Sequence, residues 1–128
     1  MRKILNIALT LGSITLAACA STKTYKDAAT YNGKNYVFDV TWKDQGLTRT
    51  TFLSINNTLV LTIDREAVKE AGCEKTSFYV IRCDYDAEFE GNKISVVAES
   101  DGQIGQQNTY YSISFNGSLV ERITVPLM

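Results

Sequence analysis

Alternating apolar and polar residues predict a chain built mainly of antiparallel strands. The clearest alternation spans residues 35–43, where four large apolar side chains share one face and polar side chains share the other. The four apolar residues are Tyr36, Phe38, Val40 and Trp42. Residues 44–46 form a turn signal, and a second strand is predicted from Leu47 to Ile55.

Two further hairpins turn at Asn56-Asn57 and at Asn116-Gly117. For both we predict an odd-numbered loop, because it places most of the large apolar residues of each hairpin on one face. In the first hairpin this face carries Leu53, Ile55, Leu59, Leu61 and Ile63. In the second it carries Tyr111, Ile113, Phe115, Leu119, Ile123 and Val125, together with Glu121, which indicates that Glu121 lies at a sheet edge or is paired.

The stretch 77–90 predicts a long strand, because it places one set of mostly apolar side chains on a single face. Its inward face carries Tyr79, Ile81, Cys83, Tyr85, Ala87 and Phe89, and from Arg82 onward its outward face is charged. A two-residue turn at Gly91-Asn92 would pair Phe89 with Ile94, Ala87 with Val96 and Tyr85 with Ala98. Cys83 is therefore predicted to point into the core.

A short helix is predicted between the two groups of strands, over residues 64–72. Asp64 suits the N-cap, Ile63 and Val68 suit a hydrophobic staple, and Gly72 suits the left-handed position after the last turn. A helix of about two turns does not persist alone, so it must pack on the sheet.

About seven strands and one short helix predict a mostly β fold, either an antiparallel β sandwich or a small flattened barrel. We expect one β domain over residues 33–128, with no internal repeat. Inward aromatic residues could form a platform for a carbohydrate or aromatic ligand, but their regular phase favours a core. They are Tyr36, Phe38, Trp42, Tyr79, Tyr85 and Tyr111, whereas Tyr110 has the opposite phase and is expected to be exposed.

Residues 1–19 have the build of a secretory signal, with Arg2 and Lys3 followed by a mostly apolar run and small residues. Within them, Leu16-Ala17-Ala18-Cys19 resembles the lipobox of bacterial lipoproteins. The resemblance implies a signal peptide over residues 1–18 and a mature chain that begins at Cys19 with a diacylglycerol on its sulfur. The competing interpretation is an ordinary signal peptide cut nearby.

The same resemblance implies a location. Two or three acyl chains, palmitate among them, anchor a protein stably where one does not, and Ala20 in place of Asp implies the outer membrane, on its periplasmic side or at the cell surface. Residues 19–32 are polar and small, and we predict a lipid-anchored tether. At ~3.5 Å per residue it would reach about 45 Å from the lipid.

Composition excludes several classes of function. Without Arg2 and Lys3, 11 basic and 14 acidic residues remain, a net charge of −3 that argues against nucleic-acid binding. The chain has no His, which removes Ser-His-Asp and Cys-His catalysis and makes most zinc and copper sites improbable. We find no nucleophile motif, phosphate loop or metal-ligand spacing, and expect a non-enzymatic protein without a cofactor.

With Cys19 lipidated, Cys73 and Cys83 remain as a pair in an oxidising compartment, and we predict a disulfide between them. Two free buried thiols and a redox-active pair are the other interpretations. The redox interpretation is weak because the spacing is not Cys-x-x-Cys.

Two surfaces are candidates for protein binding. Asp84, Asp86, Glu88 and Glu90 form an acidic face that suits docking of a basic partner, although a solvated edge is the simpler interpretation. The glycine-containing segment between residues 100 and 108 suits an interaction loop or a plain hairpin connection. Its candidate residues are Asp101, Gly102, Gln103, Ile104, Gly105 and Gln106.

These features favour an outer-membrane lipoprotein that binds another envelope protein or assists in its assembly. A second hypothesis is an envelope-protective factor of the lysozyme-inhibitor or phage-exclusion kind. A third is binding of a small hydrophobic molecule, which requires a pocket lined by Phe38, Trp42 and Tyr79.

Overall fold

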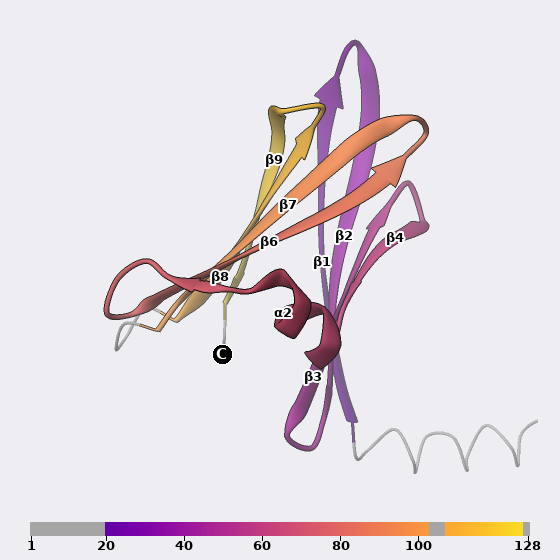
Figure 1. Ribbon diagram of the computed structural model, residues 1–128. Helices are drawn as coiled ribbons and strands as arrows, with labels where there is room; N and C mark the ends of the chain where they lie inside the picture. The colour runs from indigo at the N-terminus through magenta and orange to yellow at the C-terminus, as the bar shows by residue number, and fades with distance from the viewer. Residues whose placement is uncertain (1–19, 103–106, 127–128) are drawn as a thin grey trace, which may run out of the picture.

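Two antiparallel sheets face each other in the computed structural model, which describes residues 20–102 and 107–126 (Figure 1). One sheet has the order β1-β2-β3-β4 and the other β5-β6-β7-β8-β9, so each is a meander. The first contains β1 (Ala20–Tyr31), β2 (Lys34–Gln45), β3 (Thr48–Ile55) and β4 (Thr58–Ile63). The second contains β5 (Glu74–Lys75), β6 (Val80–Phe89), β7 (Asn92–Asp101), β8 (Asn108–Phe115) and β9 (Ser118–Pro126), and the helix α2 spans Arg65–Ala71 between them. The predicted sandwich is confirmed, and the barrel is excluded because the two sheets are separate.

The predicted tether is wrong for residues 20–31, which form the strand β1. This strand pairs with β2 along its whole length, from Ala20 opposite Gln45 to Tyr31 opposite Lys34. Tyr25, Ala29 and Tyr31 pack against the core from one side of β1. The β domain therefore includes residues 20–32, which we predicted to be part of the tether, and the described part of the chain forms nine strands where we expected about seven.

Four two-residue turns lie at one end of the sandwich, which we call the turn end. They fall at residues 32–33, 56–57, 90–91 and 116–117, and both residues of each turn have positive φ. This conformation matches the right-handed twist of the flanking strands and suits Asn and Gly. The turn after β6 is therefore Glu90-Gly91 and not Gly91-Asn92, so that Ala87, and not Phe89, faces Ile94.

The odd-numbered loops predicted for the two Asn hairpins are also wrong. Each turn has two residues, and each second strand instead contains a β-bulge, at Val60 in β4 and at Val120 in β9. The bulge restores the inward phase of the residues beyond it, so that Leu53 faces Leu61 and Tyr111 faces Ile123. Leu59 and Leu119 precede the bulges and are exposed.

The Asn of each of these turns also bonds the neighbouring strand. Asn56 N donates to the Val37 carbonyl oxygen at 2.8 Å, and Asn56 Oδ1 accepts from Val37 N at 2.9 Å. Asn116 makes the same two bonds to Lys93, at 2.8 and 2.9 Å. The segments 54–60 and 114–120 thus share one hairpin geometry, once in each sheet.

The core fills the space between the sheets near the turn end. Phe38 and Phe115 are fully buried and pack edge to face, with their ring centroids 5.9 Å apart. Tyr36, Leu53, Ile94 and Ile113 are buried around them. The inward phase predicted for these residues is confirmed.

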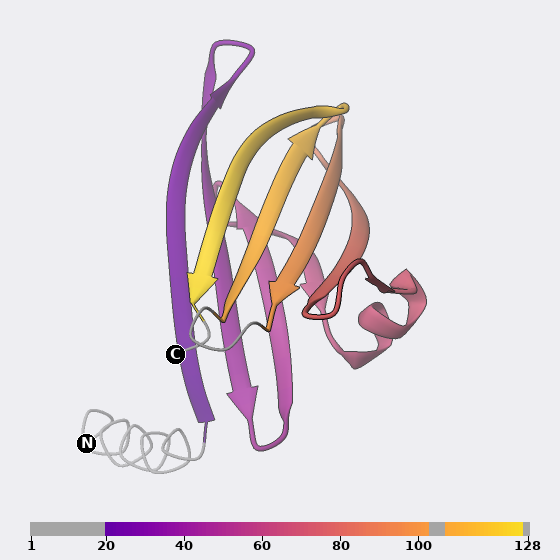
Figure 2. The ribbon, with the colours of Figure 1, turned by 90° about the vertical axis from the view of Figure 1, so that its left-hand side faces the viewer.

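The opposite end, which we call the loop end, carries the start of β1, the β2–β3 turn, α2 and the longer connections. The lower parts of the two sheets diverge there, with α2 beside them (Figure 1). On the far side from α2, β1 and β9 lie side by side (Figure 2). The sandwich is therefore closed at the turn end and open at the loop end.

Candidate functional site

A cleft of about 610 Å³ opens between the two sheets at the loop end. Its lining is mostly apolar. The first sheet and the helix contribute Trp42, Arg49, Thr51, Ile63 and Val68; the second sheet and its approach contribute Cys73, Lys75, Ile81, Cys83, Tyr85, Ala98, Ser100, Thr109 and Tyr111. Volumes of this size are typical of ligand pockets.

Polar groups at the floor of the cleft are bonded to each other. Trp42 Nε1 donates to Tyr111 Oη across the two sheets at 2.8 Å, and this bond is buried. Burial raises the pKa of the Tyr111 hydroxyl, against a smaller opposite effect of its hydrogen bonds with Thr51 and Trp42. The floor is thus a satisfied polar contact that ties the sheets together, and it offers no activated group for chemistry.

Arg49 lies at the mouth of the cleft and is held from two sides. Its guanidinium carbon lies 3.9 Å from the centroid of the Trp42 ring, a cation–π contact. Its Nε and Nη2 atoms contact the two carboxylate oxygens of Asp44 at 2.5 and 3.0 Å. This bidentate hydrogen bond lowers the pKa of Asp44 and raises that of Arg49. Arg49 therefore has a fixed position at the entrance.

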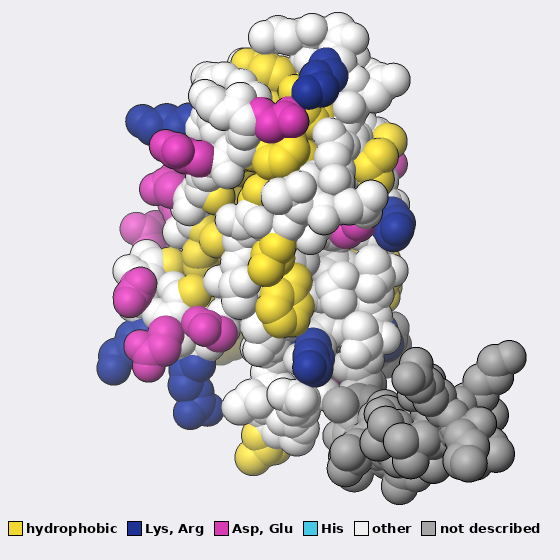
Figure 3. All heavy atoms as spheres, turned by 90° about the vertical axis from the view of Figure 1, so that its right-hand side faces the viewer, with side chains coloured by type: hydrophobic (Ala, Val, Ile, Leu, Met, Phe, Trp, Pro, Cys, Tyr) yellow, Lys and Arg dark blue, Asp and Glu magenta, His cyan; other side chains and the backbone are white. Residues whose placement is uncertain are grey.

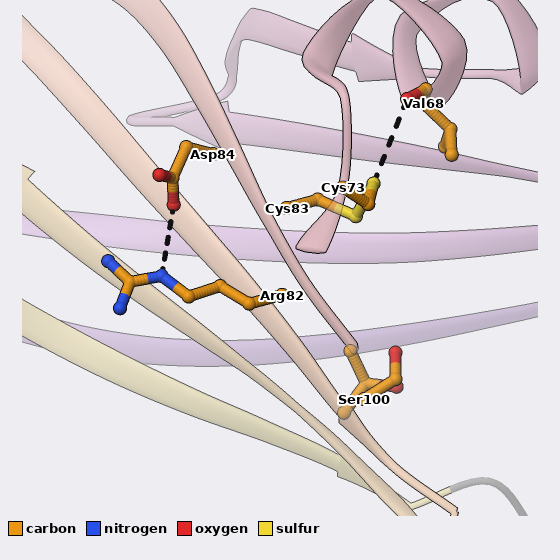
Figure 4. The surroundings of a disulfide bond; sticks show 7 residues. Val68, Cys73, Arg82, Cys83, Asp84 and Ser100 are labelled. Atoms are coloured by element: carbon orange, nitrogen blue, oxygen red, sulfur yellow. Dashed lines mark hydrogen bonds and ion pairs between the residues drawn. A yellow bond between two sulfur atoms is a disulfide. The ribbon is translucent and has the colours of Figure 1, made fainter. Parts of the chain in front are cut away.

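The predicted disulfide is present, because Cys73 and Cys83 are bonded with their Cα atoms 4.4 Å apart. It fastens the residue that follows α2 to β6 and forms part of the cleft wall (Figure 4). Cys73 Sγ lies 3.7 Å from the Val68 carbonyl oxygen, which is a contact and not a hydrogen bond, since an oxidised sulfur carries no proton. The helix itself is confirmed: Asp64 caps it by accepting from Ala67 N at 2.8 Å, and Gly72 is left-handed.

Apolar side chains continue from the cleft onto the surface. Val68, Phe78, Tyr79 and Ile81 form what we call the apolar rim, with exposed fractions of 42, 79, 49 and 48%. The rings of Phe78 and Tyr79 meet edge to face at 4.9 Å, and Lys75 Nζ lies 5.2 Å from the Phe78 ring centroid. Since Lys75, Val68 and Ile81 also line the cleft, rim and cleft form one surface.

The predicted interaction loop adjoins this rim. Asp101 ends β7, and the Gly102 backbone N–H donates to the Tyr79 carbonyl oxygen at 2.8 Å. Gln103, Ile104, Gly105 and Gln106 lie outside the described residues. The structure therefore brings the start of the loop beside Tyr79, and the interaction role stays a prediction.

The acidic face is exposed, as predicted, and lies on the opposite side of β6 from the cleft. Arg82 and Asp84 point away from Cys83 and form an ion pair at 3.3 Å (Figure 4). Glu90 is paired with Lys34 at 2.9 Å, and Glu88 is opposite Lys93 in the strand register. Acidic side chains gather along one margin of the surface in Figure 3. These neighbouring cations, and the position of the acidic residues on the part of β6 beyond its short pairing with β5, favour a solvated edge over a docking face.

Some aromatic residues differ from their predicted places. Tyr79 and Ile81 have the inward phase but are 49 and 48% exposed, because the sheets diverge at this end. Tyr110 is half-buried, with its ring under the Arg122 guanidinium at 4.3 Å. The enclosed pocket predicted from Phe38, Trp42 and Tyr79 is not formed by these residues, since Phe38 is fully buried and Tyr79 lies on the surface.

Sequence reasoning missed Phe78, the most exposed aromatic residue among those described, and Leu47. A signal for Phe78 was present, because the run 78–81 is apolar at every position and breaks the alternation of the strand. Leu47 directly follows Gly46 at a turn, a place that buries few side chains.

We predict that Tyr111→Phe destabilises the domain by about 1 to 3 kcal/mol at neutral pH, because Trp42 Nε1 loses its acceptor. In the parent protein the pKa of Tyr111 is raised by folding, so that with rising pH this hydroxyl ionises in the unfolded chain before it does so in the folded protein. Stability is therefore complete below the ordinary tyrosine pKa of 10.0 and falls as the pH rises through the folded pKa.

Urea unfolding at pH 8 and pH 11 checks this prediction. Tyr111→Phe should show a smaller loss between the two pH values than the parent. Tyr110→Phe is the matched control, because this neighbouring ring lies on the outer face of β8. An unchanged alkaline slope in Tyr111→Phe would contradict the assignment.

The described residues show neither a metal-ligand cluster nor a membrane-spanning helix, and comparison with known proteins identifies no relative of the chain. Within the described ranges no three His, Cys, Asp or Glu side chains gather as metal ligands do, and no helix there is long and apolar enough to cross a membrane. No protein-family model matches the chain, and neither a curated protein nor a solved structure is significantly similar to it.

Proposed function

We propose that this protein is a lipoprotein of the outer membrane, anchored through Cys19, whose β domain binds another envelope protein and has no catalytic role. The anchor is motivated by Leu16-Ala17-Ala18-Cys19 at the end of an apolar segment that begins with Arg2 and Lys3. The binding role is motivated by the loop end of the sandwich.

The observation that carries the proposal is the apolar rim, two of whose residues, Val68 and Ile81, also line the cleft. Phe78 is 79% exposed, whereas Phe38 and Phe115 are fully buried in the core. Exposed apolar surface with a polar surround is typical of a site for a protein partner. Aromatic residues and Arg, here Phe78, Tyr79 and Arg49, are the types that contribute most to protein interfaces.

Crosslinking in intact cells tests the proposal. A photoreactive phenylalanine analogue at position 78 of the full chain should form a discrete adduct with one envelope protein. The matched control is the same analogue at position 119, because Leu119 is 64% exposed but lies at the turn end. Ile81→Asp in the chain labelled at position 78 should remove most of the adduct, and Cys19→Ser should release the protein from the membrane fraction.

An equal adduct at both positions, or none at position 78, would contradict the binding role.

One specific observation favours a second candidate function, binding of a small hydrophobic molecule: the cleft has an apolar lining and a volume of about 610 Å³. This alternative would be favoured by a small apolar compound that copurifies with the parent but not with a cleft variant such as Ala98→Trp. No protein adduct should then form at position 78.

A further inference from the structure

Leu47 is the most exposed large apolar side chain that the structure describes, with an exposed fraction of 103%. It sits at the tip of the β2–β3 hairpin, after Gly46, whose φ of 64° turns the chain. A single exposed Leu on a surface needs no explanation by itself. Its position relative to the start of β1 is what gives it meaning.

The hairpin tip adjoins the residue through which we propose that the protein is anchored. Ala20, the residue after Cys19, is paired with Gln45, and Leu47 follows two residues later. From the spacing of neighbouring strands and of consecutive Cα atoms, Ala20 and Leu47 are on the order of 10 Å apart. Since β1 is paired from Ala20 onward, no slack chain separates the domain from Cys19.

The charges at this end suit a lipid surface. Lys23 and Lys43 are exposed on β1 and β2 near the same tip, and Arg49 follows on β3. Two anions lie near this tip. Asp44 is held by Arg49. Asp64 lines a pocket with Leu47 but has the cation Arg65 in the same lining. Anionic headgroups attract Lys and Arg side chains that flank an inserted apolar residue.

We propose that the anchored domain stands directly on the membrane on its β2–β3 hairpin, with Leu47 inserted among the lipids beside the acyl chains of Cys19. This inference rests on the proposed lipid anchor and adds an orientation to it. The loop end faces the lipid and the turn end faces away. A partner that reaches the apolar rim must then itself lie at the membrane surface, as an integral or anchored protein does.

Depth-dependent quenching tests the orientation. The full chain is produced in Gram-negative cells as the Leu47→Cys variant, labelled with an environment-sensitive fluorophore and reconstituted into vesicles of phosphatidylethanolamine and phosphatidylglycerol that carry nitroxide-labelled lipids. Labelling is specific, because Cys73 and Cys83 are bonded and Cys19 carries the lipid. Leu59→Cys and Leu119→Cys are the matched controls, since both side chains are exposed at the turn end.

The label at position 47 should lose most of its emission and shift to shorter wavelength, while labels at positions 59 and 119 keep theirs. Vesicle flotation is measured on each sample, and the urea midpoint confirms that each variant folds. Protein that floats but shows equal quenching at all three positions, or none at position 47, would overturn the orientation and leave the anchor standing. Protein that does not float would overturn the anchor and the orientation with it.

Discussion

Phe115→Ala is expected to lower the free energy of unfolding by about 3 to 5 kcal/mol, the range for removing a buried aromatic side chain. Phe115 is fully buried at the centre of the aromatic cluster. Its ring centroid lies 5.0 Å from that of Tyr36 and 5.1 Å from that of Tyr31. Because Tyr31 comes from β1 and Phe115 from β8, the substitution also weakens contact between the two sheets.

Urea unfolding of the purified chain measures this loss, with Phe78→Ala as the matched control. Phe78 is the same residue type but is 79% exposed, so its replacement is expected to change stability by no more than about 0.5 kcal/mol. Similar losses in the two variants would show that the core is not where the structure places it. A domain of this size is typically stable by 5–15 kcal/mol, so the Phe115 variant is expected to fold but to unfold at much lower urea.

Removal of the disulfide is expected to have the second largest effect. Replacing both Cys73 and Cys83 by Ser should cost about 2 to 3 kcal/mol, since the bond closes a loop with a sequence separation of 10 in the unfolded chain. In the folded protein the bond holds the end of α2 against β6. The helix buries no residue fully, so we expect its amides to lose protection from hydrogen exchange more than those of the sheets.

Reduction of the parent protein provides the control for the serine variant. Reduced parent and double variant should unfold at the same urea concentration, both below the oxidised parent. A parent whose unfolding does not respond to reduction would contradict a stabilising role of the bond. A double variant that is less stable than the reduced parent would instead point to a cost of the Ser side chains.

The local elements of the fold follow well from the sequence. The alternation in β2 and β6 correctly predicts that Phe38 and Tyr85 face inward, and the Asp64 and Gly72 signals correctly bound the helix. These predictions succeed because side-chain periodicity and capping act within a few residues. The bulges at Val60 and Val120 were missed because one extra residue shifts the phase without leaving a mark in the pattern.

The strand β1 shows a different limit. Its residues are small and polar, and only Tyr25, Ala29 and Tyr31 pack against the core. It is held mainly by backbone hydrogen bonds to β2 over twelve residues. Backbone hydrogen bonds do not require any particular side-chain pattern. The sequence of a strand at the edge of a sheet can therefore be mistaken for that of a linker.

The sequence by itself determined the β class, the inward residues of the central strands, the helix with its caps and the pairing of Cys73 with Cys83. Each depends on neighbours in the chain or on the number of cysteines. The tertiary structure decided that the sheets diverge at the loop end, because covering a residue requires an element from elsewhere in the chain. That divergence leaves Tyr79 and Ile81 about half exposed and opens the cleft beside Trp42, while the pairing of β1 with β2 places Ala20 near Leu47.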